Sequence, residues 1–115
     1  MTLAGTWQLH HQWGEHGYNI TAKFGADGSI TVKGGFFGTW TVLGTSNQVA
    51  LAIANFDRGS QFFGSVTSYA GNVSGGVMGG QMKGGKRGGT ISQGTWHGIR
   101  RSILKAPKEA HQVPD

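Results

Sequence analysis

The sequence predicts an all-β protein, an eight-stranded antiparallel up-and-down β-barrel. Three observations support this fold class. Bulky residues alternate with polar ones through most of the chain. Glycine-rich turn signals separate these runs at intervals of about a dozen residues. The chain has 115 residues, the length of a single domain. A meander of this kind that closes on itself has no exposed strand edges, which otherwise promote aggregation.

The first three strands follow from alternation and one turn. Alternate residues from Trp7 to Trp13 share one strand face, His11 among them, and polar residues occupy the other face. Residues 18–24 alternate in the same way. The Gly-Ala-Asp-Gly turn signal at 25–28 joins them to a short third strand, which predicts a hairpin.

The later strands follow from the same pattern. Residues 36–40 and 62–66 have matching layouts, two phenylalanines followed by a glycine, and each is expected to lie in a strand. A turn at 44–47 ends the fourth strand, and the glycine-rich link at 84–89 separates the last two. The eight predicted strands are 7–13, 18–24, 30–33, 36–42, 49–54, 62–66, 72–83 and 89–99.

The tripeptide Gly-Thr-Trp occurs three times, at 5–7, 38–40 and 94–96. Because side chains alternate along a strand, each glycine lies on the same face as its tryptophan. We expect the glycine to leave room for a large side chain from a neighbouring strand, and to let the strand coil tightly enough to close a small barrel. The alternative is a chance repeat in a chain that holds 22 glycines.

The early Gly5-Thr6-Trp7, the meander of strands, and the basic pair Arg100-Arg101 after the last strand resemble the calycin superfamily, which includes the lipocalins and avidins. The resemblance covers residues 4–101. It implies that Trp7 packs across the closed end of the barrel, with Arg100 or Arg101 against its ring. It also implies that the protein binds small molecules, as members of the superfamily generally do. It implies no particular ligand, because the residues with which an avidin binds biotin have no counterpart here.

This reading divides the chain into a lipocalin-like barrel at residues 1–101 and a basic tail at 102–115, expected to be disordered or partly helical. The predicted function is non-enzymatic binding of an apolar or aromatic molecule in the lumen. A small barrel can also be packed solid, and alternation leaves both possibilities open. The residues expected to contact a ligand are Trp13, Tyr18, Trp40, Phe62 and Tyr69.

Catalysis has little support in the sequence. The five acidic residues are scattered, and no serine or threonine lies in a nucleophile motif. An enzyme that works by cavity shape and one proton donor stays an open alternative. We expect no cofactor and no metal: His10 and His11 lie on opposite strand faces, so at most one of them can join His97 in a metal site.

The net charge of +5 comes from the C-terminal third of the chain. Its basic side chains suggest a second function, a surface that binds an acidic partner such as a nucleic acid. A protein inhibitor that acts through the loop at 55–60 or through the tail is a further alternative. The residues proposed for an acidic partner are Lys83, Lys86, Arg87, Lys105 and Lys108.

The absence of cysteine excludes disulfides and thiolate chemistry. The N-terminal segment lacks the pattern of a signal peptide, so we expect a cytoplasmic protein if Met1 is the native start, and a secreted or periplasmic one only if a signal peptide has been removed. No stretch is apolar for long enough to predict a membrane span, and the sequence leaves the oligomeric state open.

Overall fold

A computed structural model describes residues 2–86 and 88–101 of the chain, and it forms a closed antiparallel barrel of eight strands in sequence order. The predicted fold class is confirmed. The tail at 102–115 and Arg87 lie outside the described residues. The strands are β1 (Gly5–Trp13), β2 (His16–Phe24), β3 (Ser29–Val32), β4 (Phe36–Val42), β5 (Gln48–Asn55), β6 (Val66–Ser74), β7 (Val77–Gly85) and β8 (Ser92–Arg100).

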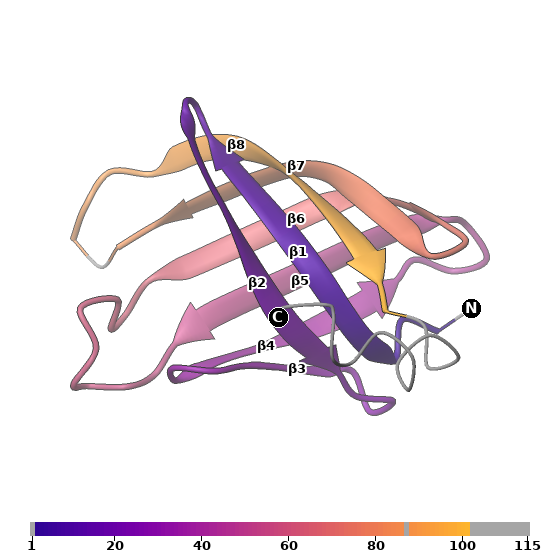
Figure 1. Cartoon of the computed structure of the whole chain (residues 1–115), viewed down its shortest axis with the longest axis horizontal. Coiled ribbons are helices and arrows are strands. Elements are labelled where there is room, and N and C mark those ends of the chain that lie inside the picture. Colours follow the sequence, from indigo (N-terminus) through magenta and orange to yellow (C-terminus); the bar gives the residue numbers. More distant parts are fainter. Residues whose placement is uncertain (1, 87, 102–115) are drawn as a thin grey trace, which may run out of the picture.

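The barrel closes where β8 pairs with β1, in a register that runs from Trp7 opposite Arg100 to Gln12 opposite Thr95. Figure 1 shows the two ends of the barrel. The N-terminal segment lies at one end, together with the short turns that connect β4 to β5 and β6 to β7. The long loop between β5 and β6 and the link between β7 and β8 lie at the other.

Two of the predicted strands are misplaced, whereas the bounds of the other six agree with the structure to within three residues. The sixth was expected at 62–66, but Phe62 and Gly64 lie in turns and β6 runs from Val66 to Ser74. The seventh was expected at 72–83, but Gly75, with a φ of 62°, ends that run in a turn and β7 begins at Val77. The error arose because β6 places few bulky residues inside the barrel, so its alternation is weak.

The end of the barrel that holds the N-terminus is packed solid. Trp7 is fully buried there, and its indole N–H donates to the Leu3 carbonyl at 2.8 Å. The guanidinium of Arg100 lies over the Trp7 ring, 4.9 Å from its centroid, and donates to the Thr2 carbonyl at 2.7 Å. The buried core behind this plug includes Leu3, Leu9, Phe24, Ile30, Val49, Leu51, Val73, Met78, Met82 and Trp96.

The three Gly-Thr-Trp glycines differ in what they do. A Cβ at Gly94 would collide first with the backbone oxygen of Gln12 on neighbouring β1, and it would also crowd Met82 and the Trp13 ring, so this glycine allows a close strand approach as well as the large side chains that were expected. Gly38 lets β4 approach the backbone of β5 at Ala52. Gly5 has a φ of 135°, a conformation that other residues rarely adopt. One repeat therefore serves three local requirements, each met by the absence of a Cβ.

Within the described residues there is no helix long and apolar enough to cross a membrane.

Candidate ligand-binding cavity

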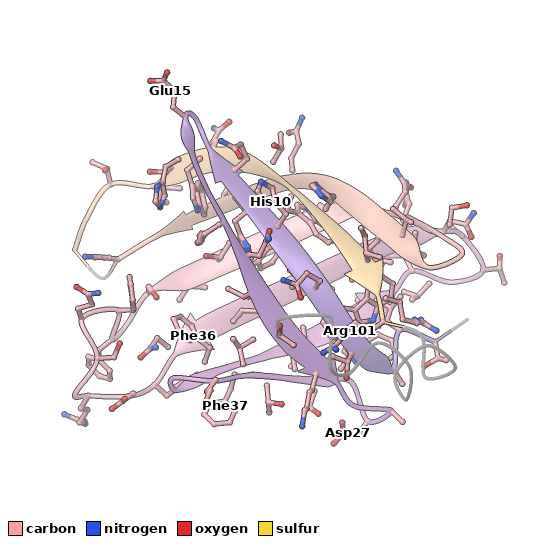
Figure 2. The ribbon with its side chains drawn as sticks, viewed as in Figure 1. His10, Glu15, Asp27, Phe36, Phe37 and Arg101 are labelled. Atoms are coloured by element: carbon pink, nitrogen blue, oxygen red, sulfur yellow. The ribbon has the colours of Figure 1, made fainter. Side chains whose placement is uncertain are left out.

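A cavity of about 520 Å³ occupies the half of the lumen opposite the Trp7 plug. Unequal strand lengths help to open it. The register pairs β3 only with Ala22, Lys23 and Phe24 of β2, so the first part of β2 has no strand partner on that side. The hairpin of β1 and β2 extends well past β3, with Glu15 at its tip (Figures 1 and 2). Three residues from this gap, His16, Tyr18 and Ile20, line the cavity.

The walls of the cavity are mainly apolar and aromatic. Four of the five residues predicted to contact a ligand lie in its lining, namely Trp13, Tyr18, Phe62 and Tyr69. The indole N–H of Trp13 donates to the Tyr18 hydroxyl at 3.1 Å, which fixes the two rings relative to each other. The other lining residues are His11, His16, Ile20, Val32, Phe36, Ile53, Ser65, Thr67, Gly84, Gly85, Lys86 and Ser92.

Trp40, the fifth predicted residue, does not line this cavity. Its indole N–H donates to the Gly25 carbonyl at 2.9 Å, in the turn between β2 and β3. That turn belongs to the plugged half of the barrel, because Phe24 lies opposite Gly5 and packs on the Trp7 ring. Alternation correctly predicts that Trp40 faces inward, but it does not indicate the height of a residue along the barrel axis.

Phe36 and Phe62 form one side of the mouth, with ring centroids 6.0 Å apart. Figure 2 shows Phe36 and its neighbour Phe37 on opposite sides of β4, as strand alternation requires. Phe62 comes from the loop between β5 and β6, and the Lys86 ammonium lies 5.9 Å from its ring centroid. The mouth thus combines aromatic surface with the cationic side chain of Lys86.

Asn55, at the end of β5, holds the loop that carries Phe62. It is buried, its side-chain amide donates to the Gly34 carbonyl at 3.1 Å, and its amide oxygen accepts from the Asp57 backbone N–H at 2.9 Å. Its backbone also bonds to Gly64 and Ser65 at the far end of the loop. The loop at 55–60, considered above as an inhibitory segment, is therefore anchored to the barrel through Asn55.

The floor of the cavity holds a polar pair that the sequence did not predict as a pair. His11 and Tyr69 are 2% and 4% exposed, and His11 Nε2 lies 2.6 Å from the Tyr69 hydroxyl oxygen. His11 Nδ1 is also buried and has no hydrogen-bond partner among the described residues. Burial lowers the pKa of His11 to about 4 and raises the pKa of Tyr69 above its usual value, so both groups are neutral near pH 7.

The signal for His11 is present in the sequence, because it shares the inward face of β1 with Trp7, Leu9 and Trp13. A histidine on an otherwise apolar strand face is most often a core residue whose hydrogen bonds are satisfied. The partner of His11 is Tyr69, which lies 58 residues further along the chain. The pairing depends on the barrel register, which cannot be derived from one strand.

The two arginines of the predicted barrel-end signature have different places. Arg100 is the one that contacts the Trp7 ring. The backbone N–H of Arg101 donates to the Thr6 carbonyl at 2.8 Å, which extends the contact between the first and last strands past Arg100.

The proposed acidic-partner residues are only partly described. Lys83 is exposed on β7 and Lys86 lies at the cavity mouth. Arg87, Lys105 and Lys108 fall outside the described residues, so a role for this group in binding an acidic partner stays a prediction.

The histidines near the first turn lie on opposite faces of the barrel wall, as alternation predicts. His10 stacks on His97 of β8 on the outside, with ring centroids 5.0 Å apart. Hydrogen bonds with the side chains of Gln12 and Asn19 raise the pKa of His10. Within residues 2–86 and 88–101, no group of three or more histidine, aspartate or glutamate side chains lies close enough to hold a metal ion.

Comparisons of the chain with models of known protein families, with curated proteins and with solved structures gave no significant match.

Proposed function

We propose that this protein is a non-enzymatic binding barrel that holds a small apolar or aromatic molecule in the open half of its lumen. The observation that supports this most strongly is the cavity of about 520 Å³, which has the size of a small-molecule site and walls of aromatic and aliphatic side chains. Among the described residues that line the cavity there is no carboxylate, so they supply no pair of acidic side chains.

The arrangement of the two barrel ends favours the same function. A fully buried Trp7 under Arg100 closes one end, which is the arrangement that the calycin resemblance implies, and we propose membership of that superfamily on this basis. The plug also fills the closed half with buried side chains. A preorganised base beneath an open apolar pocket lowers the cost of ordering the site when a ligand enters.

Titration with N-phenyl-1-naphthylamine, an uncharged apolar fluorophore, tests this proposal. We expect saturable binding, seen as increased probe fluorescence and quenching of the protein's tryptophan emission. Ser92→Trp places an indole in the cavity mouth and should weaken binding by about tenfold or more. Gln93→Trp, one position along β8 and exposed on the outer face, is the matched control and should bind normally. Absence of saturable binding by the unmodified protein would refute the proposed function.

A further inference from the structure

The polar floor of the cavity has an unbalanced hydrogen-bond count. Neutral histidine carries one polar hydrogen and tyrosine carries another. The contact between His11 Nε2 and the Tyr69 hydroxyl uses only one of these two hydrogens. The pair therefore holds one donor that this contact leaves unused, whichever group donates in the contact.

The two possible arrangements differ in where the unused hydrogen lies. If Tyr69 donates to Nε2, the hydrogen of His11 is on Nδ1, which is buried and makes no hydrogen bond of ordinary geometry within the described residues. Burial lowers the pKa of His11 and hydrogen bonding with the Leu9 backbone opposes this, so the Leu9 backbone is the candidate acceptor in that arrangement. If His11 donates from Nε2, the lone pair of Nδ1 is buried without a donor, and the Tyr69 hydroxyl hydrogen can point into the cavity that both residues line. In the second arrangement the pair presents a donor to the cavity without ionisation of either group.

We infer that the lumen ligand carries an uncharged hydrogen-bond acceptor, such as a ketone or aldehyde oxygen, at the end that reaches His11 and Tyr69. This inference rests on the proposed function and specifies its ligand class. The acceptor would take the unused hydrogen of the pair, while the apolar body of the ligand packs against Trp13, Ile53 and Phe62.

The electrostatics of the floor favour an uncharged acceptor over an anion. Burial holds His11 neutral, and the aromatic rings of Tyr18 and Trp96 pack around the pair. A carboxylate placed there would lose its hydration without gaining a cation. Lys86, the lysine in the lining, is exposed at the mouth and is not part of the floor.

Two probes of matched shape test the inference. 2-Acetylnaphthalene and 2-isopropenylnaphthalene differ only in a carbonyl oxygen in place of a methylene group. The measured quantity is the ratio of their dissociation constants in the unmodified protein and in Tyr69→Phe, which keeps the ring against Trp96 and removes the hydroxyl. In Tyr69→Phe we expect the ketone to bind about tenfold more weakly relative to the alkene than it does in the unmodified protein. This is the effect of losing one hydrogen bond in an enclosed site.

Ser68→Ala is the matched control, because it removes a hydroxyl one position before Tyr69, at an exposed site on the outer face of β6 that does not line the cavity. Its ratio should match that of the unmodified protein. The carbonyl stretching frequency of bound 2-acetylnaphthalene gives a second readout: hydrogen bonding lowers it, and Tyr69→Phe should restore the higher value.

The outcomes separate this inference from the proposed function. If neither probe binds, the proposed function fails and the inference fails with it. If both probes bind and their ratio is the same in all three proteins, or if the bound ketone has the carbonyl frequency it shows in an alkane, the inference is wrong and the binding function stands. The frequency measurement on the unmodified protein decides the matter even if Tyr69→Phe does not fold.

Discussion

Replacement of Trp7 by alanine should remove the largest part of the plug at the closed end of the barrel. Trp7 is fully buried, its ring centroid lies 5.9 Å from that of Phe24, and Arg100 covers its face. Truncation of a buried tryptophan costs about 3–5 kcal/mol, and here the Leu3 carbonyl also loses its donor. This is a large fraction of the stability of a domain of this size, which is typically about 5–15 kcal/mol.

Urea denaturation of three variants measures the effect. Arg100→Ala should cost about 1 kcal/mol, because a cation above an aromatic ring contributes little beyond the packing of its methylene groups. Phe56→Ala removes a ring that is 64% exposed and should change stability by no more than about 0.5 kcal/mol. A Trp7→Ala protein less than about 1 kcal/mol weaker than the unmodified chain would refute the plug as described.

Two further predictions concern polar residues around the cavity. The folded pKa of His11 is about 4, below the 6.5 of the unfolded chain, so stability should be full above about pH 6.5 and fall by about 3 kcal/mol towards pH 4. Urea melts between pH 4 and pH 6.5 measure how the free energy of unfolding depends on pH. His11→Gln should make this dependence weaker, whereas His16→Gln, at an exposed position, should leave it as it is. An unchanged pH dependence in His11→Gln would contradict the burial of His11 in its neutral form. Asn55→Ala leaves the Gly34 carbonyl and the Asp57 N–H without these partners, so it should lower the free energy of unfolding by about 1–3 kcal/mol. Proteolysis of the loop at 56–65 should also become faster. If this loop resists proteolysis as well as it does in the unmodified protein, Asn55 is not its anchor.

The fold was predictable from sequence because most of the strands carry their own signal. Alternation in β1 and β5 is strong, and the barrel follows from hairpin-length connections between sequential strands. The error at β6 has a physical cause: its inward positions hold Thr67, Tyr69, Gly71 and Val73, so only part of that face is apolar.

The cavity was less predictable, because it depends on how far strands extend relative to one another. No local pattern indicates that β3 would pair with only three residues of β2 and leave a gap in the wall. The contact between His11 and Tyr69 likewise depends on the closed register of the whole sheet. The sequence predicts on which face of a strand a residue lies, but not its position along the barrel axis. Trp40 illustrates this, because it faces inward but bonds to the turn between β2 and β3, away from the cavity.

The most direct test of a barrel that is solid at one end and hollow at the other uses its four tryptophans as internal reporters. Uniformly ¹⁵N-labelled protein gives one indole N–H signal for each, and N-phenyl-1-naphthylamine is the titrant. We predict a large shift for Trp13 in the cavity wall and no shift for Trp7 in the plug or for Trp40 beside the β2–β3 turn. Shifts of Trp7 and Trp40 with Trp13 unmoved would contradict this description of the lumen.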